Sequence, residues 1–282
     1  MPHTSRKKRP TTTKRLQIAD PSSGWTHITT TAHSSKSTSH KNTTTDELLP
    51  AECPPKLTLP ILQSQFTSHK QKYDLSATAQ TLRDTIRNIF FHHHSHLTDS
   101  GNANSDTQLP TEIVCIGLGS LSGLLRGGWV DRRRVSMYQL AALVGIIECF
   151  ETQDTKISIY AQDPVFNALD KALLSSLNIT VVESPRAFEL VGPRTVLFCP
   201  GAERVHLKDM LVRGPGVVVS SCDDEGIFSS VDVYRRGNGH DGNDGNVDDD
   251  HGEREVKTRQ GVKLPLFEEQ ESAFWGVGVY YY

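Results

Sequence analysis

Apolar residues are concentrated in the middle of the chain and at its C-terminal end. Residues 1–56 are rich in Thr, Ser, Lys and His with few aliphatic side chains, and residues 235–260 are dominated by Gly, Asp, Asn, Arg and Glu. Neither stretch buries enough apolar surface to offset the entropy that a chain loses on folding. The pattern therefore predicts one globular domain over residues 57–234, between a disordered N-terminal arm and a disordered acidic segment.

Within this domain, whose core is predicted at residues 110–222, short apolar runs alternate with helical periodicity. The runs predict strands at residues 113–117, 157–160, 179–182, 195–198 and 216–220. Helices are predicted at residues 75–91, from Ser136 onward, and at residues 164–177 and 203–212. The runs lack period-two alternation, which is typical of strands covered on both faces. With right-handed crossovers, this alternation predicts an α/β fold with a Rossmann-like, doubly wound, mostly parallel sheet.

Residues 261–282 are again apolar and aromatic. A tail of this composition is expected to dock on the domain, with an added strand at residues 277–281. The acidic, Gly/Asp-rich segment before it then becomes a surface insertion.

The net charge of −3 combines a basic beginning, at residues 6–15, with an Asp-rich stretch at residues 241–250. The basic arm has two interpretations, a nuclear-import or nucleic-acid contact and a solvated tail, and we favour the solvated tail. The longest apolar run, residues 140–147, is far shorter than the roughly 20 residues that cross a membrane, and no secretory signal opens the chain. The five scattered cysteines contain no C-x-x-C pair, which indicates reduced thiols in the cytosol or nucleus.

In a doubly wound sheet, ligands bind beyond the carboxyl ends of the strands. Residues that follow a predicted strand or open the next helix are therefore the candidates for binding a small molecule. They are Gly117, Gly119, Ser120, Gln139, Asp163, Pro164, Pro200 and Gly201. None is predicted to be catalytic, and no metal site is predicted.

The glycine loop at residues 117–123 has two interpretations. Its glycines allow backbone amides to approach a phosphate or an adenosyl group closely. The loop departs from the dinucleotide fingerprint G-x-G-x-x-G at Ser122, and a tight turn alone also explains it.

The polar residues after the loop have structural alternatives as well. Asp163 suits hydrogen bonding to ribose hydroxyls, but Asp163-Pro164 also reads as a helix N-cap followed by proline. Gln139 suits a ligand contact, but Ser136 and Gln139 also have the spacing of a capping box. Nearby arginines, Arg126, Arg132, Arg133 and Arg134, form either an anion-attracting lip or a solvated loop.

Two groups of reactive side chains are weaker candidates for a functional site. Cys199 and His206 have the residue types of a nucleophilic pair, although a cysteine at a strand end is more often small core filling. The histidines at residues 92–96 have metal-binding side chains but no carboxylate or thiol beside them, which favours a solvated run.

Several motifs together resemble the sensitivity-to-red-light-reduced (SRR-like) domain family, in particular its fungal members. They are Gly-Trp-Thr-His-Ile at residues 24–28, Ile-Gly-Leu-Gly-Ser at 116–120, Ser-x-x-Gln-Leu at 136–140, Tyr-Ala-Gln-Asp-Pro-Val-Phe at 160–166, Thr-Val-Leu-Phe-Cys-Pro at 195–200 and Glu-x-Glu-Ser-Ala-Phe at 269–274. The chain departs from the family at Gly201, where many members have histidine, and at residues 220–222, where many have Gly-Asn-Ser.

The resemblance implies a Rossmann-like domain and roles in light signalling, circadian timing or the regulation of haem synthesis, without an agreed enzymatic activity. We therefore expect a regulatory protein that binds an unidentified small molecule and unidentified protein partners. The alternative is an enzyme that binds S-adenosylmethionine or a nucleotide through residues 117–123 and Asp163. A nucleic-acid partner for the basic arm is the least favoured hypothesis, and the sequence identifies no cofactor.

Overall fold

The computed structural model describes residues 15–19, 26–30, 49–91, 109–124, 131–151, 156–221 and 259–282. The chain divides into two compact units, Met1–Glu47 and Leu48–Tyr282. In the first unit, β1 (Arg15–Ala19) pairs antiparallel with β2 (Thr26–Thr30), inside the stretch that composition assigns to a disordered arm. The second unit contains the sheet and the helices.

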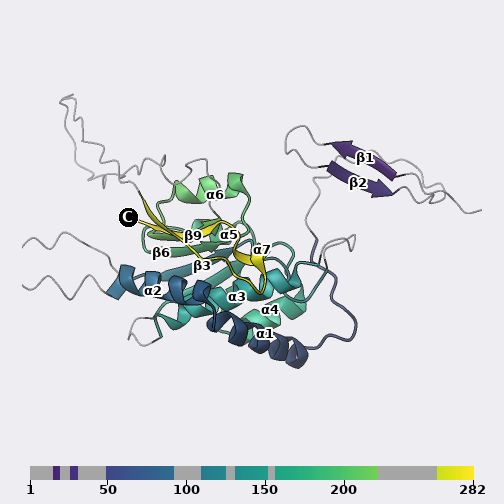
Figure 1. Ribbon diagram of the computed structural model, residues 1–282, viewed down its shortest axis with the longest axis horizontal. Coiled ribbons are helices and arrows are strands. Elements are labelled where there is room, and N and C mark those ends of the chain that lie inside the picture. Colours follow the sequence, from purple (N-terminus) through teal and green to yellow (C-terminus); the bar gives the residue numbers. More distant parts are fainter. Residues whose placement is uncertain are drawn as a thin grey trace, which may run out of the picture. The chain divides into compact units, whose positions relative to one another are not determined.

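The second unit is built on a seven-stranded mixed sheet with the order β5-β4-β3-β6-β7-β9-β8. Strands β3, β6 and β9 of this sheet are labelled in Figure 1. The strands are β3 (Glu112–Ile116), β4 (Ser158–Gln162), β5 (Thr180–Val181), β6 (Thr195–Cys199), β7 (Val217–Ser221), β8 (Gln260–Lys263) and β9 (Val277–Tyr281). Strands β3 to β7 are parallel to one another, whereas β9 pairs antiparallel with β7 and with β8. The predicted α/β class and mostly parallel sheet are therefore confirmed.

The order of the parallel strands reverses at β3. From β3 the chain moves outward on one side to β4 and β5, and it then returns to the other side of β3 to form β6 and β7. The loops after β3, β4 and β6 consequently meet at one edge of the sheet, because the carboxyl ends of parallel strands point the same way.

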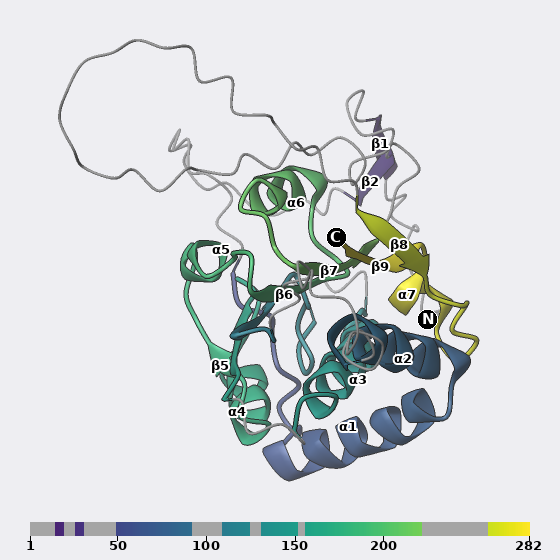
Figure 2. The ribbon, with the colours of Figure 1, turned by 90° about the vertical axis from the view of Figure 1, so that its left-hand side faces the viewer.

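Helices cover both faces of this sheet. They are α1 (Leu59–Asp74), α2 (Ala77–Phe91), α3 (Arg133–Glu148), α4 (Ala168–Ser176), α5 (Arg186–Glu189), α6 (Arg204–Leu211) and α7 (Glu271–Phe274). Helices α5 and α6 lie on one face, and α1 to α4 lie on the other, as Figure 2 shows. Helix α1 packs against α3 and α4, and α7 packs against α3.

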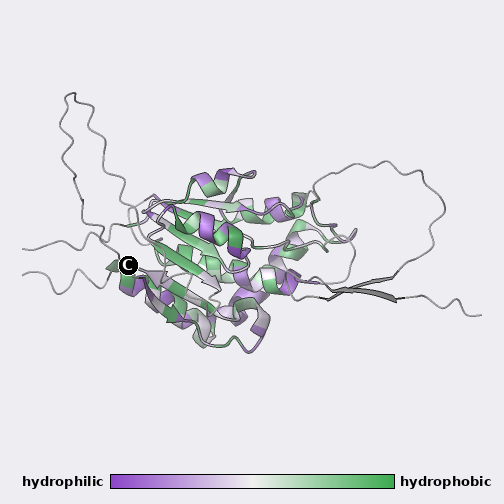
Figure 3. Cartoon of the chain, turned by 90° about the horizontal axis from the view of Figure 1, so that it is seen from above, coloured by the Kyte–Doolittle hydropathy of each residue, from purple (hydrophilic) through white to green (hydrophobic). Residues whose placement is uncertain are grey.

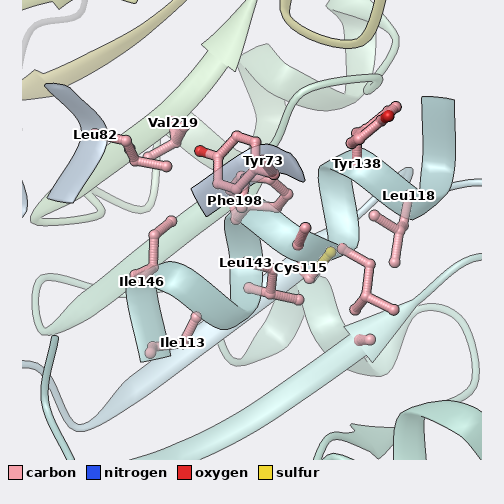
Figure 4. Close-up of a cluster of buried hydrophobic side chains, with 14 of the residues drawn as sticks. Tyr73, Leu82, Ile113, Cys115, Leu118, Tyr138, Leu143, Ile146, Phe198 and Val219 are labelled. Atoms are coloured by element: carbon pink, nitrogen blue, oxygen red, sulfur yellow. The ribbon is translucent and has the colours of Figure 1, made fainter. Parts of the chain in front are cut away.

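The central strands divide their side chains between two hydrophobic clusters. In β3, Ile113 and Cys115 join the cluster under α2 and α3, whereas Val114 and Ile116 join the cluster under α5 and α6. The larger cluster, which includes Leu143 of α3, is drawn in Figure 4. A strand covered on both faces needs apolar residues at every position, which explains the unbroken apolar runs seen from above in Figure 3.

The first helix was not predicted, and the start of the second was placed wrongly. Helix α1 buries few apolar side chains, Leu62, Phe66 and Tyr73, so its helical periodicity is weak. Helix α2 begins at Ala77, two residues after the predicted start, and Asp74 is the last residue of α1. The hydroxyl of Ser76 accepts a hydrogen bond from the amide of Ala79 at the start of α2.

Two further helix starts differ from the prediction. Helix α3 begins at Arg133, so the predicted capping box at Ser136 and Gln139 is wrong and both residues lie inside the helix. Helix α4 begins at Ala168 with Asn167 as its N-cap, so the N-cap predicted at Asp163 and Pro164 is also wrong. A polar residue near a helix start has several backbone amides within reach, and local spacing alone does not select among them.

The polypeptide on either side of the predicted domain also packs on it. Strand β9 pairs with β7 and with β8, so the C-terminal segment contributes two strands to the sheet. Ala51, which precedes the predicted boundary at residue 57, is buried and donates its amide to the Val165 carbonyl at 2.9 Å. The compact unit thus begins earlier than the hydrophobic pattern predicts.

Several predicted features lie outside the described residues. They are the histidines at residues 92–96, Arg126, Cys222, the basic run at residues 6–14 and residues 235–258 of the acidic segment. Among the helices that the structure describes, none has the length and apolar character needed to span a membrane.

We predict that Val279→Ala lowers the free energy of unfolding by about 2 kcal/mol, because it removes two methyl groups and leaves a cavity in the larger hydrophobic cluster. Val279 is fully buried, whereas Val212 after α6 is 77% exposed. The matched control Val212→Ala should change stability by less than about 0.5 kcal/mol. Denaturant unfolding of both variants measures the difference, and equal effects would show that β9 contributes no buried core.

Candidate functional site

A pocket of about 170 Å³ opens at the sheet edge where the loops after β3, β4 and β6 meet. The N-terminal turn of α3 forms one wall, and the glycine loop forms another. The pocket is lined by Gly117, Leu118, Gly119, Ser120, Gly123, Arg132, Arg133, Val135, Ser136, Gln139, Asp163, Val165 and Gly201.

The structure brings most of the predicted binding residues to this pocket. Those that line it are Gly117, Gly119, Ser120, Gln139, Asp163 and Gly201. Pro164 and Pro200 do not line it: Pro164 is exposed, and Pro200 is buried at the end of β6. Arg132 and Arg133 of the predicted arginine lip also belong to the lining.

The glycines are required by backbone conformation and by close packing. Gly117 and Gly119 both have φ of +76°, in the left-handed region where side chains are disfavoured. A methyl group on Gly201 would lie 2.7 Å from the Gly117 carbonyl oxygen, so the loops after β3 and β6 touch through their backbones. A methyl group on Gly119 would lie 2.7 Å from Ser136 Oγ, inside the pocket.

Asp163 fastens the glycine loop to the loop after β4. Its Oδ2 accepts a hydrogen bond from the Gly119 amide at 2.7 Å, and its Oδ1 accepts one from the Val165 amide at 3.0 Å. The second bond spans two residues, which is the geometry of an Asx turn rather than a helix cap. Burial raises the pKa of the Asp163 carboxyl, the two amides lower it, and the negative charge of Asp170 raises it further.

A second carboxylate, Asp170 in the first turn of α4, organises the rest of the glycine loop. Asp170 is fully buried, and its two oxygens accept five hydrogen bonds. Ser120 Oγ and the Asn167 amide donate to Oδ2 at 2.6 and 3.1 Å. The Leu121 amide, the Ser122 amide and the Ser122 hydroxyl donate to Oδ1 at 3.1, 2.8 and 2.6 Å.

Asn167 extends this network to the segment before α1. Its side chain caps α4 by accepting from the amides of Leu169 and Asp170, and it donates to Ser122 Oγ and to the Ala51 carbonyl. Asn167 and Asp170 together form a capping box. Sequence reasoning missed both residues, although the Asn-x-x-Asp spacing before an apolar run is the signal that finds such a box.

The N-terminus of α3 lines the pocket, and its N-cap side chain forms no capping bond. Its N-cap residue, Arg132, makes no side-chain hydrogen bond to the first turn. Arg133 pairs with Asp131, whose Oδ1 accepts from the Arg133 side-chain Nε at 2.9 Å and from its amide at 3.1 Å. Further along the helix, Gln139 is buried and donates its Nε2 to the Ala273 carbonyl of α7 at 3.0 Å.

The predicted Cys199 and His206 pair is not assembled. Cys199 is fully buried in β6, and burial raises the pKa of its thiol to about 12. His206 is exposed on α6, where its ring packs edge-on against Phe188. The thiol of Cys199 is therefore neutral and enclosed at physiological pH, as expected for a core cysteine.

Acidic, thiol and imidazole side chains do not cluster elsewhere in the part of the chain that the structure describes. Within those residues, no group of three or more His, Cys, Asp or Glu side chains is arranged to hold a metal ion.

We predict that Asp170→Asn lowers the free energy of unfolding by about 3–5 kcal/mol. The side-chain NH₂ of asparagine would face amide and hydroxyl donors that now bond to the carboxylate, so some of them would lose their acceptor. The matched control is Asp209→Asn on the exposed face of α6, with an expected change below about 0.5 kcal/mol. Urea unfolding of both variants measures the effect. Equal stability of the two variants would contradict an organising role for Asp170.

Stability should also depend on pH through Asp163. Its pKa in the folded protein lies above the ordinary value of 3.8, so the folded state binds this proton more tightly than the unfolded chain does. Its contribution to stability is fully present below that ordinary value and is lost as pH rises through the raised pKa.

The measurement is the unfolding free energy of the wild type minus that of Asp163→Asn, which lacks this titration. We expect this difference to fall as pH rises from about 4 to about 7. A difference that stays constant or increases over that interval would contradict the raised pKa.

Comparison with known proteins agrees with the motifs in the sequence. The model of the SRR1 domain family matches residues 62–224, which include β3, β4, β6 and the pocket loops between them. No curated protein and no solved structure is significantly similar to the chain. Because the family match covers more than half of the 282 residues, it shows the family directly. The chain belongs to the SRR1 domain family.

Proposed function

We propose that this chain is a fungal-type, SRR-like regulatory protein that uses a Rossmann-like, doubly wound scaffold to bind a small molecule. The single observation that carries the proposal is the position of the pocket. It lies at the carboxyl ends of β3, β4 and β6, where the parallel strand order reverses. Open α/β sheets bind their ligands at this position, beyond the point where neighbouring loops diverge.

The arrangement of the sheet supports the scaffold. Its five parallel strands have the order β5-β4-β3-β6-β7, which is the order in which two βαβ halves diverge from a first strand. Helices lie on both faces of these strands. The antiparallel strands β9 and β8 extend one edge and leave the reversal at β3 intact.

The rigidity of the glycine loop supports ligand binding. Asp163 and Asp170 together hold the loop through hydrogen bonds to Gly119, Ser120, Leu121 and Ser122. A binding loop that is held in place before the ligand arrives loses less conformational entropy on binding. Gly119 leaves the space beside Ser136 open, because any side chain at this position would occupy it.

The alternative function is an enzyme that binds S-adenosylmethionine or a nucleotide. The same loop and Asp163 favour it, since they suit the adenosine portion of such a ligand. Against it, Asp163 is the one carboxyl group among the described pocket residues, and its bonds to the amides of Gly119 and Val165 give it a structural role. The volume of about 170 Å³ is also small for S-adenosylmethionine or a whole nucleotide. We therefore favour binding without catalysis.

We further propose that the protein acts in the cytosol or nucleus with protein partners. The buried cysteines Cys115, Cys149 and Cys199 are free thiols, which suits a reducing compartment. Two large apolar side chains, Leu75 and Trp275, are 90% and 71% exposed, and a partner protein would cover them favourably.

Ligand-induced thermal stabilisation of the full chain tests the proposed function. The panel contains S-adenosylmethionine, NAD, NADP, nucleoside and sugar phosphates, and haem. A true ligand at about a hundred times its Kd should stabilise the protein by about 2.7 kcal/mol. We expect at least one compound to raise the Tm of the wild type, and Gly119→Ala to abolish that shift by filling the pocket.

The control is Gly214→Ala, which shares the left-handed strain, with φ of +67°, but has open space around the added methyl group. This variant should lose stability without losing the ligand-induced shift. Asp163→Ala provides a second pocket variant should Gly119→Ala fail to fold. No shift with any compound, or a shift retained by both pocket variants, would overturn binding at this pocket.

A further inference from the structure

We propose that the pocket receives the phosphate group of a small phosphorylated metabolite at the N-terminus of α3. This inference rests on the proposed function and adds the chemical class of the ligand. Four features of the described residues carry it: the first-turn amides of α3 beyond Arg133, the hydroxyl of Ser136, two arginines in the pocket lining, and the acceptor carboxylate of Asp163.

The start of α3 presents backbone donors to the pocket. The first amides of a helix have no partner inside the helix and carry the positive end of its dipole. Helix α3 is sixteen residues long. The side chain of its N-cap residue, Arg132, forms no capping bond, and among the first-turn amides Asp131 accepts only that of Arg133, whereas α4 has a complete capping box. Its residues Arg133 and Val135 line the pocket, so an anion seated there would lie at the first turn.

Ser136 supplies an independent sign of a ligand. Its side chain is 2% exposed, and it lines the pocket in the first turn of α3. Its hydroxyl forms no hydrogen bond with any residue that the structure describes, although buried hydroxyls are ordinarily paired. The Oγ atom lies on the side of Gly119, where an added methyl group would be 2.7 Å away. A phosphate oxygen in this space would accept the hydroxyl proton.

Two arginines make the mouth of the pocket basic. Arg132 is exposed and forms no ion pair with any carboxylate in the described part of the chain. Arg133 shares its charge with Asp131, to which it is paired. Arginine binds phosphate through two parallel hydrogen bonds, and such charge-assisted bonds are about twice as strong as neutral ones. The guanidinium of Arg132 is therefore the main uncompensated charge at this wall.

One group in the pocket lining accepts hydrogen bonds rather than donating them. The carboxylate of Asp163 would repel an anion but accept bonds from sugar hydroxyls. A ligand that satisfies both these donors and this acceptor carries a phosphate and hydroxyl groups. The volume of about 170 Å³ suits a sugar phosphate and is too small to enclose a dinucleotide.

Phosphate matches the donors better than carboxylate does. The start of α3 offers first-turn amides, the Ser136 hydroxyl and the Arg132 guanidinium as donors. Two coplanar carboxylate oxygens accept fewer hydrogen bonds than these donors can form together. A phosphate monoester has three acceptor oxygens in a tetrahedral arrangement and a charge of about −1.5 to −2 at neutral pH.

Isothermal titration of the full chain tests this proposal with ribose 5-phosphate and inorganic phosphate as probes, and with ribose and malate as comparison ligands. We expect ribose 5-phosphate to bind more tightly than inorganic phosphate, and ribose alone to bind weakly. Arg132→Gln should weaken ribose 5-phosphate binding about tenfold or more, and Ser136→Ala about fivefold.

The matched control is Arg213→Gln, which removes an exposed arginine after α6, ahead of β7 and away from the pocket. Its affinity for ribose 5-phosphate should equal that of the wild type. Affinity that is insensitive to both Arg132→Gln and Ser136→Ala would overturn the placement at α3. If malate bound more tightly than ribose 5-phosphate through the same two residues, the group recognised at α3 would be a carboxylate and not a phosphate.

The outcome also separates this inference from the proposed function. If S-adenosylmethionine or haem stabilises the protein while every phosphate compound fails to bind, the phosphate inference is wrong and the binding function survives. If no compound of either panel binds, both fail together.

Discussion

A buried carboxylate is the constraint on which the candidate site depends. Asp170 has no exposed surface, and removing a carboxylate from water is costly unless hydrogen bonds replace its hydration. Its five donors come from the start of α4 and from Ser120, Leu121 and Ser122 of the glycine loop. The loop after β3 therefore has one conformation that satisfies Asp170, and the shape of the pocket follows from it.

The first turns of α3 connect the pocket with the C-terminal segment. Gln139 lines the pocket and donates to the Ala273 carbonyl, while Arg134 in the same helix pairs with Glu269. The segment that makes these contacts continues into β9, which lies between β7 and β8. A ligand that shifts the start of α3 would thus act on the docking of this segment.

Elements with many buried apolar residues were predicted more accurately than elements with few. The strands β3, β4, β6 and β7 lie within two residues of their predicted bounds, because a strand covered on both faces is apolar throughout. Helix α1 was missed since it buries only Leu62, Phe66 and Tyr73 among its sixteen residues. The site residues after the strands were found through topology, whereas Ser136 was given the wrong local role and Asn167 was given none. Helix starts depend on a few hydrogen bonds, and local sequence offers several equivalent sets of them.

The sequence by itself determined the core strands, the α/β class, the family and the position of the glycine loop. Each of these follows from local composition and from the spacing of residues along the chain. Only the tertiary structure decided what holds that loop. Asp163 contacts Gly119 across 44 positions, and Asp170 contacts Ser120 across 50. The sequence around a carboxylate in a first helical turn is the same whether that carboxylate faces water or a distant loop. Its partner is chosen when the parallel strands align and bring those segments together.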